Sequence, residues 1–505
     1  MSGAALARTV VGLFATIAAC RPAPPSHPPE GVDVERYTVH LRLDPATLRL
    51  SGRVRLDVRY PAGLAALPLA LDDAMEVRAV RVNGRTVSIT HRDGTLSVPL
   101  DGDTLSAVEV VYRGVPEEGV YRAEAAGQTV VYTDAWPTRG AGWLPGLHVP
   151  SDPAALDLTL DVPPGVEVVA SGTPAPAGTP GRFRFHLSAD APTYTFAFAV
   201  ADFTEVADTS AGGIPIRHHL LEPDKAPLLA RTAAVLDTLQ ELLGPYPYVS
   251  YGTVQVPMEF AGMENAAMPF LRADLYTVYD GQNAVEEINI HEAVHQWFGN
   301  DVVPADWREL WLAEGFATYL STVVYERLDG PEIAQRQRVL MTQLSLRDAQ
   351  RPLVPARYRH PSEVLTATAY GKGGSVLHLL RLRVGDAAFF RAVRRLAQEW
   401  ADRPLTTTTV KFTFEAESGE DLAPFFRYWV YGRPIPTLPT TWDAEARRLR
   451  WHVEGDEGTL ARLPFELLIR QGGTERAVSA LAGEAVLPGP ERPEVEPVGV
   501  LLRVR

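Results

Sequence analysis

The hydrophobic period of the chain changes twice, and this change constrains the fold more than any other feature. From Val34 to about Phe203, segments such as "YTVHLRLD" and "SGRVRLDVRY" alternate apolar and polar residues, with turn residues between them. From about residue 224 to 430, apolar residues recur at helical spacing, as in "DAAFFRAVRRLAQEWAD". From Pro434 the alternation returns. The sequence therefore predicts a multidomain α+β protein.

Three folded domains are expected in this order along the chain. An N-terminal antiparallel β domain should span residues 32–205, a mostly α domain residues 206–433, and a small β-sandwich residues 434–505. Acidic residues outnumber basic ones by 62 to 48, for a net charge of −14, and no run of Lys and Arg with interleaved aromatics occurs. A nucleic-acid partner is excluded on this ground, because phosphate binding needs a positive surface.

The first 31 residues differ from the rest of the chain. Arg8 precedes an apolar run from Val10 to Ala19, which is typical of a signal peptide and too short to span a bilayer. Cys20 is the only cysteine, and the residues that end on it resemble a bacterial lipobox. We expect a signal peptide over 1–19 and a lipidated Cys20 on a Pro-rich tether over 20–31, and hence an exported cell-envelope lipoprotein held to the membrane by its lipid. The alternatives are a plain signal peptide with a chance cysteine and a weak N-terminal anchor.

The stretch "HEAVHQWFGN" (291–300) places two histidines four residues apart in a predicted helix. Asn283 can cap the start of this helix, and Gly299 is a natural stop at its end. His291 and His295 lie one turn apart on one face, as two ligands of a single ion require. Glu292 is rotated about 100° from His291, so it is placed to contact a water on the metal rather than to bind the metal. Two solvated surface histidines are the alternative.

A third ligand must come from another segment. The stretch "WRELWLAEGFATYL" (307–320) predicts a second helix, and Gly and Pro residues break the chain before it. Glu314 lies among apolar neighbours in this helix, where a carboxylate needs a partner such as zinc. On spacing alone, an exposed helical glutamate is an equally good interpretation.

These residues resemble the zinc site of the gluzincins. "HEAVHQWFGN" and "WLAEGFA" are similar to the corresponding blocks of the zinc aminopeptidase family of aminopeptidase N and leukotriene hydrolase type, although that family usually has Asn where this chain has Ala313. The resemblance implies a thermolysin-like catalytic domain and one Zn²⁺ per chain, held by His291, His295 and Glu314. It also implies that Glu292 is the general base.

Two further blocks follow the same family pattern. "AGMEN" (261–265) resembles the exopeptidase motif, in which the glutamate, here Glu264, holds the free α-amine of the substrate. Gly262, Met263 and Asn265 would line the substrate beside it. "AYGKGG" (369–374) resembles the block with the catalytic tyrosine, here Tyr370, which would stabilise the oxyanion.

The resemblance is looser in the flanking segments. Many family members carry a second amine-binding glutamate in the N-terminal β domain, and the chain has Asp134 and Trp136 in the region of that motif. Asp134 is therefore a candidate second anchor. The large helical C-terminal domain of many members is expected to be missing, because the sequence ends at Arg505.

The implied function is that of a zinc aminopeptidase. It would cleave the first peptide bond of peptides with a free α-amine, using water activated by zinc and by Glu292. A thermolysin-type endopeptidase, with Glu264 incidental, is one alternative. A non-catalytic lipoprotein that uses the zinc fold as a binding module is another, although the chain keeps both Glu292 and Tyr370.

Overall fold

The computed structural model describes residues 29–505, apart from 101, 103, 280–281, 348–350, 433–434, 456–465, 479–481, 499–502 and 505. Cys20 and the predicted signal peptide lie outside this part of the chain, so the lipid anchor stays a prediction. The chain forms two compact units. The first runs to Trp307 and includes 359–363 and 397–405, and the second contains the remaining residues. Within the described residues, no helix is long and apolar enough to span a membrane.

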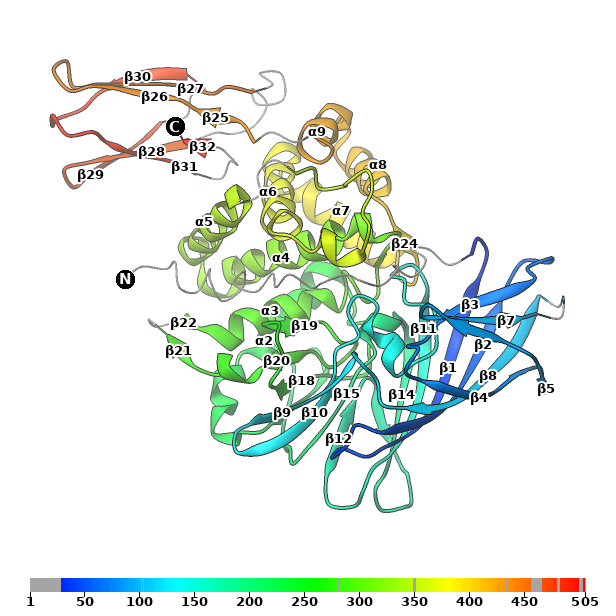
Figure 1. The fold of residues 1–505 in the computed structure, drawn as a ribbon. Helices are drawn as coiled ribbons and strands as arrows, with labels where there is room; N and C mark the ends of the chain where they lie inside the picture. The colour runs from blue at the N-terminus through cyan, green and yellow to red at the C-terminus, as the bar shows by residue number, and fades with distance from the viewer. Residues whose placement is uncertain are drawn as a thin grey trace. The chain divides into compact units, whose positions relative to one another are not determined.

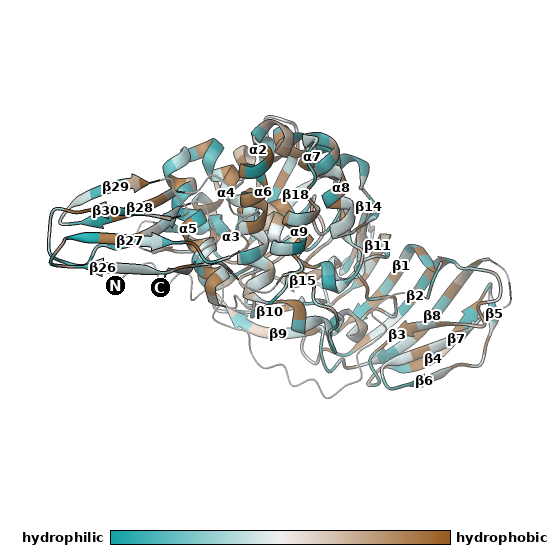
Figure 2. Ribbon diagram, turned by 90° about the horizontal axis from the view of Figure 1, so that it is seen from above, coloured by the Kyte–Doolittle hydropathy of each residue, from teal (hydrophilic) through white to brown (hydrophobic). Residues whose placement is uncertain are grey.

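An eight-stranded sheet forms much of the N-terminal β region (Figure 1). Its strand order is β13-β14-β11-β1-β2-β8-β4-β5. Buried and exposed residues alternate along β1 and β2, as the sequence pattern predicts, and Figure 2 shows the same alternation as brown and teal bands. Most neighbours are antiparallel, but β1 pairs with β11 in parallel. The strands are β1 (Asp33–Leu43), β2 (Leu50–Arg59), β4 (Glu76–Val82), β5 (Arg85–Thr86), β8 (Leu105–Gly114), β11 (Pro153–Asp161), β13 (Thr173–Ala175) and β14 (Arg182–Pro192).

Two smaller sheets complete this region. One has the order β12-β15-β10-β9 and the other the order β3-β7-β6. The strands of the first are β9 (Val120–Ala125), β10 (Gln128–Thr133), β12 (Glu167–Ala170) and β15 (Phe198–Ala201). The strands of the second are β3 (Ala66–Ala70), β6 (Thr90–Arg92) and β7 (Thr95–Pro99).

A five-stranded sheet with the order β16-β17-β18-β20-β19 lies next in the chain. All six residues of β18 are buried, as is typical of a central strand covered on both faces. Strand β19 is at the edge of the sheet and pairs only with β20 among the strands of this sheet. The predicted domain limit at residue 205 falls within β16, and the domain boundaries stay a prediction. The strands are β16 (Thr204–Thr209), β17 (Pro215–Leu220), β18 (Tyr251–Val256), β19 (Gly262–Met263) and β20 (Phe270–Arg272).

Helices α2 (Thr232–Leu243) and α3 (Ala284–His295) also belong to the first unit. The predicted cap of α3 is confirmed, because the Asn283 side chain accepts a hydrogen bond of 3.4 Å from the Glu286 backbone N–H. The predicted stop at Gly299 is wrong, since α3 ends at His295. The chain makes one more turn, and Gly299 supplies its left-handed φ of 129°.

The second unit contains most of the helices that the 3.6-residue period predicts. A short π-helical turn, η7 (Thr368–Lys372), leads directly into α6. Such turns are rare and occur often at functional sites. The helices in this part of the chain are α4 (Trp311–Asp329), α5 (Pro331–Arg347), α6 (Gly373–Val384), α7 (Asp386–Glu399), α8 (Thr407–Ser418) and α9 (Ala423–Trp429).

The C-terminal strands form two three-stranded sheets, with the orders β26-β27-β30 and β29-β28-β31, and a short β25-β32 pair. The predicted fold class, with a β region, a helical catalytic region and C-terminal strands, is thus confirmed. These strands are β25 (Thr437–Leu438), β26 (Thr440–Asp443), β27 (Arg448–His452), β28 (Glu466–Gln471), β29 (Thr474–Val478), β30 (Ala482–Val486), β31 (Glu494–Val498) and β32 (Arg503–Val504).

Candidate active site

Helix α3 presents two imidazole nitrogens to the same point. The Nε2 atoms of His291 and His295 lie 3.1 Å apart, with the two rings inclined at 80°. Nδ1 of His295 lies 3.0 Å from the backbone oxygen of Phe298. Because a carbonyl oxygen only accepts hydrogen bonds, this contact puts the proton of His295 on Nδ1. Its Nε2 then carries the lone pair that a metal ion needs.

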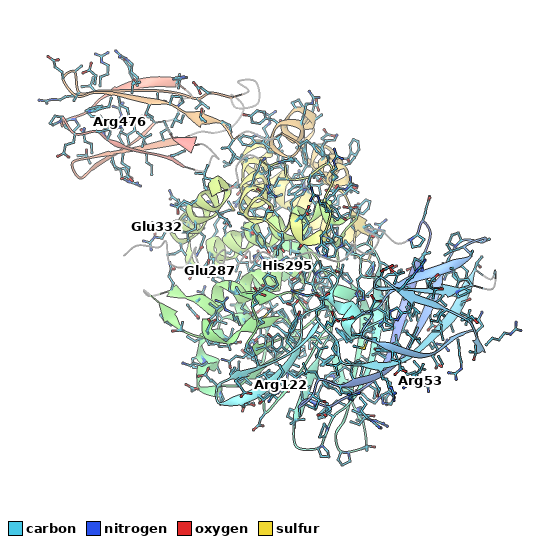
Figure 3. The ribbon with its side chains drawn as sticks, in the orientation of Figure 1. Arg53, Arg122, Glu287, His295, Glu332 and Arg476 are labelled. Atoms are coloured by element: carbon cyan, nitrogen blue, oxygen red, sulfur yellow. The ribbon has the colours of Figure 1, made fainter. Side chains whose placement is uncertain are left out.

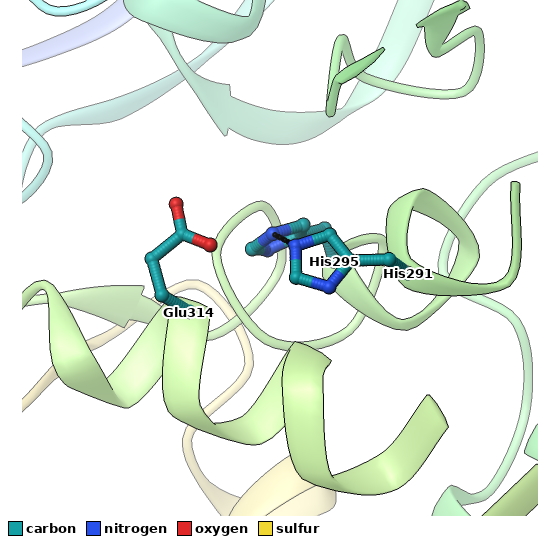
Figure 4. Close-up of side chains that lie close together, drawn as sticks. All are labelled: His291, His295 and Glu314. Atoms are coloured by element: carbon teal, nitrogen blue, oxygen red, sulfur yellow. Dashed lines mark hydrogen bonds between the residues drawn. The ribbon is translucent and has the colours of Figure 1, made fainter. Parts of the chain in front are cut away.

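Glu314, in the first turn of α4, completes this group. One ligand atom from each of His291, His295 and Glu314 can be chosen so that all three lie within 4.8 Å of one another, and Figure 4 shows the carboxylate facing the imidazoles. Two imidazoles and one carboxylate form the donor set of many catalytic zinc sites. A tetrahedral zinc ion with bonds of about 2.05 Å would hold two nitrogens about 3.3 Å apart, close to the 3.1 Å found here. These residues therefore fit a zinc ion.

A second cluster shares His295. Ligand atoms of Glu264, Glu292 and His295 also lie within 4.8 Å of one another, and all three side chains are buried. Two buried carboxylates at this separation repel each other when both are ionised. Their juxtaposition favours a positively charged group beside them, next to the proposed metal ligands.

Strand β19 passes very close to α3 at Gly262. A Cβ atom at residue 262 would lie 2.2 Å from Oε1 of Glu292 and 2.6 Å from Cγ2 of Ile288. Both distances are shorter than real Cβ contacts allow, so only glycine fits at this position. The close approach brings the edge strand of the sheet against the helix that carries Glu292.

Two polar residues after α3 hold the segment that carries Glu264. Asn300 donates a hydrogen bond of 2.6 Å from Nδ2 to the backbone oxygen of Glu264. Gln296 accepts one of 2.8 Å from the backbone N–H of Ala267 and donates one of 3.1 Å to the backbone oxygen of Glu292. The sequence analysis did not identify Gln296 and Asn300 as site residues. Their position within "HEAVHQWFGN", next to the metal ligands in the sequence, could have identified them.

The other residues of the "AGMEN" block are also buried. Met263 is 4% exposed and Asn265 is 1% exposed. The side-chain amide atoms of Asn265 form no hydrogen bond with any residue that the structure describes. A buried amide without partners costs free energy, so Asn265 has the capacity to bind a polar group of a ligand.

Tyr370 lies on η7, and this turn packs against α4 beside Glu314. A Cβ atom at Gly315 would lie 3.0 Å from the backbone carbon of Gly373, so the two backbones are almost in contact. Glycine also permits close packing at Gly371, where a Cβ atom would lie 2.6 Å from the backbone nitrogen of Ser345 on α5. The glycines of "AYGKGG" therefore hold the Tyr370 turn tightly against its neighbouring helices.

Asp134 is buried and forms an ion pair with Arg139. Its Oδ1 also accepts a hydrogen bond of 3.3 Å from the backbone N–H of Trp136. The guanidinium of Arg139 lies 5.6 Å from the centre of the Phe260 ring, just before the "AGMEN" block. The charge of Asp134 is thus already compensated within the protein, which the sequence did not indicate. Its role as a second amine anchor stays a prediction.

Comparison with known proteins agrees with this geometry. Residues 229–429 match the model of the peptidase family M1 domain, which includes every residue of both clusters and Tyr370. The chain is 25% identical to aminopeptidase B of Rattus norvegicus over 458 residues, which cover 80% of this chain and 68% of the rat protein. It is 26% identical to leucine aminopeptidase 2 of Emericella nidulans over 348 residues, which cover 64% of this chain and 55% of the fungal protein.

Solved structures extend the comparison to the fold. The M1 zinc metallopeptidase of Deinococcus radiodurans is 27% identical and superposes with a TM-score of 0.70, covering 82% of this chain and 97% of that one. Yeast LTA4 hydrolase, at 18% identity, shares the fold with a TM-score of 0.73 over 81% of this chain and 69% of that one. Residues 229–429 thus carry a peptidase family M1 domain, and these matches together with the zinc donor set support a gluzincin zinc aminopeptidase.

Proposed function

We propose that this protein is a zinc aminopeptidase that removes the first residue from short peptides with a free α-amine. The observation that carries the proposal is the position of the Glu264 carboxylate, which lies within 4.8 Å of ligand atoms of both Glu292 and His295. An amine bound there has its first peptide bond beside the metal ligands. Two further observations support it: the relatives are named aminopeptidases, and a variant of the Deinococcus enzyme was solved with a Tyr-Ser-Ala substrate.

Glu264 selects for the free amine in this proposal. Its carboxylate pairs with the substrate ammonium, and the buried setting strengthens the pair. The hydrogen bond from Asn300 to the Glu264 backbone oxygen holds this carboxylate in place for the amine. The substrate then extends from Glu264 back along β19, whose free edge can pair with the peptide backbone as an added strand.

Glu292 acts as the general base. His291, His295 and Glu314 would hold a zinc ion, which when bound would supply a Lewis acid and a water whose pKa is lowered to about 7. The Glu292 carboxylate, held between His295 and Gly262, accepts the proton of the attacking water. It then delivers this proton to the nitrogen of the leaving amine, so the protons balance over the cycle.

Tyr370 stabilises the transition state. The carbonyl oxygen of the scissile bond gains negative charge during attack, and the Tyr370 hydroxyl donates a hydrogen bond to it. The support comes from the backbone next to the turn: Gly373, which directly follows η7, is in close contact with Gly315 beside Glu314. A rigid turn suits a donor that must already point at the oxyanion before the reaction starts.

The test uses one peptide in two forms. The tetrapeptide Leu-Ala-Ala-Ala, with a free or an acetylated N-terminus, is incubated with the protein starting at Glu30, with and without a chelator. Release of leucine from the free form alone, abolished by the chelator and restored by Zn²⁺, is the expected result. Internal cleavage of the acetylated form would identify an endopeptidase, and a lack of cleavage of either form would favour a binding module.

We also propose that Cys20 carries the lipid of an exported envelope lipoprotein. The support is the lipobox-like sequence that ends on the only cysteine. Labelling of bacterial cells with a radioactive fatty acid should mark the wild-type protein. The Cys20→Ser variant should be unlabelled, and equal labelling of both proteins would overturn this proposal.

A further inference from the structure

Helix α3 has only three residues that reach solvent among its twelve. The other nine are buried, and the three are Glu286, Glu287 and His291. Glu286 forms an ion pair of 3.0 Å with Arg231, whereas His291 faces the metal position. Glu287 and the metal ligand His291 are thus both partly exposed on α3. Glu287 has no role in the zinc site or in the proposed reaction.

The side chain of Glu287 has no hydrogen-bond or ion-pair partner among the described residues of the chain. Burial alone raises the pKa of this carboxyl to about 7, and no nearby charge contributes to the shift. The ionised form is thus destabilised in the free protein, and a cation would stabilise it. A half-buried carboxylate beside a reaction centre that has no ion-pair partner in the protein can bind a positively charged group of a ligand.

The axis of α3 gives the direction in which a substrate passes. His295 is the last residue of α3, and Glu264, from another segment, lies close to it. His291 lies one turn before His295, and Glu287 lies one turn before His291, toward the N-terminal end of the helix. Figure 3 labels Glu287 and His295 on this helix. At 1.5 Å per residue, Glu287 is about 6 Å past His291 along the axis.

The position of β19 gives the same direction. Glu264 is close to Glu292 and His295, while Gly262, two residues earlier, is close to Ile288 and Glu292. A peptide whose amine is held by Glu264 therefore runs back along β19 toward the first turns of α3. Glu287 lies about 7.5 Å along the helix axis from Glu292. An extended chain advances about 3.4 Å per residue, so the residue after the scissile bond covers part of this distance and a long arginine or lysine side chain spans the rest.

We propose that Glu287 is a specificity-determining residue that binds a cationic side chain, arginine or lysine, at the second position of the substrate. The inference rests on the proposed aminopeptidase function and deepens it. An arginine at that position forms a charge-assisted hydrogen bond with the Glu287 carboxylate, and a glutamate there is repelled.

The test compares three peptides, Leu-Arg-Ala-Ala, Leu-Ala-Ala-Ala and Leu-Glu-Ala-Ala. For the wild-type zinc enzyme at pH 8, kcat/KM for the Arg peptide should exceed that for the Glu peptide by at least tenfold. The Glu287→Gln variant should lose most of this ratio, and Glu287→Lys should reverse it. A ratio cancels any general loss of activity in the variants. Glu332→Gln, which changes an exposed glutamate in the first turn of α5, should keep the wild-type ratio.

The outcomes separate this inference from the function on which it rests. Cleavage of the Ala peptide with equal Arg-to-Glu ratios in the wild-type enzyme and the Glu287→Gln variant would overturn the role of Glu287 and leave the aminopeptidase intact. Absence of cleavage of all three peptides by the wild-type zinc enzyme would overturn both. If Glu287→Lys fails to fold, the Glu287→Gln ratio still decides the matter.

Discussion

Oε1 of Glu292 lies 2.2 Å from the point at which a side chain on residue 262 would begin. The absence of a side chain at Gly262 is therefore what allows the edge strand β19 to lie over the proposed catalytic base. The relationship links two sequence blocks, "AGMEN" and "HEAVH", that are separated by 25 residues in the chain.

The Gly262→Ala variant should displace Glu292 or push β19 away from α3. We expect kcat/KM on Leu-Ala-Ala-Ala to fall by at least tenfold, because small displacements of catalytic groups are costly, while bound zinc stays near one per chain. Gly489→Ala is the matched control, since a Cβ atom there would make only ordinary contacts of 3.4 Å or more. Equal activity of the two variants would show that the close approach is unimportant.

The Glu292→Gln variant should bind zinc and lose turnover. The amide keeps the shape of the side chain but cannot accept the proton, so kcat should fall by about two to four powers of ten. Metal analysis and peptide hydrolysis on the same sample measure both quantities. Retention of more than a tenth of the wild-type kcat would remove Glu292 from the role of base.

The Tyr370→Phe variant should fold and bind zinc but lose about two to three powers of ten in kcat, the usual contribution of an oxyanion donor. Its KM should change little, because the hydrogen bond strengthens in the transition state. Tyr431→Phe, which changes an exposed tyrosine, serves as the control. If the two variants have the same kcat, oxyanion stabilisation must come from another group.

Glu264 and Asp134 should differ in their effect on free-amine substrates. Glu264→Ala removes the carboxylate proposed to bind the substrate amine, and we expect kcat/KM to fall by at least a hundredfold. Asp134→Asn should have a smaller effect, because Arg139 already compensates the charge of Asp134. Steady-state kinetics on Leu-Ala-Ala-Ala rank the two variants, and a larger loss for Asp134→Asn would make Asp134 the main amine anchor.

The stability of the protein should fall as the pH rises toward 8, in part because of Asp152. Burial, followed by smaller effects of Asp33 and Asp190, raises the pKa of this carboxyl from 3.8 to about 8. Between these values the folded protein binds one proton more than the unfolded chain, so this stabilisation is complete below pH 3.8 and is lost as the pH rises through about 8. The slope is at most about 1.4 kcal/mol per pH unit.

The Asp152→Asn variant isolates this effect. Its Tm should depend less on pH between 5 and 8 than the Tm of the wild-type protein, as measured by thermal unfolding in a series of buffers. The comparison concerns the slope alone, because the substitution also changes the buried hydrogen bonding of the side chain. Parallel Tm profiles would show that Asp152 titrates at the same pH in the folded and unfolded chains.

Local patterns in the sequence predicted the features that depend on neighbouring residues. Asn283 caps α3 as expected, because a cap needs only its own backbone and the N–H three residues later. The change from a period of two to one of 3.6 predicted the order of β region, helical region and C-terminal strands, but not strands β18 to β20, which lie within the range predicted to be helical. The grouping of His291, His295 and Glu314 was inferred from family resemblance, since spacing alone left Glu314 open, and the structure brings the three together. Their functional roles remain predictions.

Features that depend on the conformation of a turn or on distant segments were not predictable. The pairing of Asp134 with Arg139 was missed, since only the conformation of the intervening turn determines whether the side chains meet. The hydrogen bond from Asn300 to Glu264 joins residues 36 positions apart. The end of α3 at His295 was also missed, because the extra turn before Gly299 is stabilised by hydrogen bonds such as that from the Gly299 N–H to Val302.

The π-helical turn at Thr368–Lys372 has a consequence for how this segment tolerates changes in length. A π turn holds one residue more than an α turn, so deletion of a single residue before Tyr370 could restore regular helical hydrogen bonding without unfolding the segment. The deletion would rotate the tyrosine by about 100° about the helix axis. A chain with one residue fewer in this turn should therefore keep its fold and misplace the proposed donor.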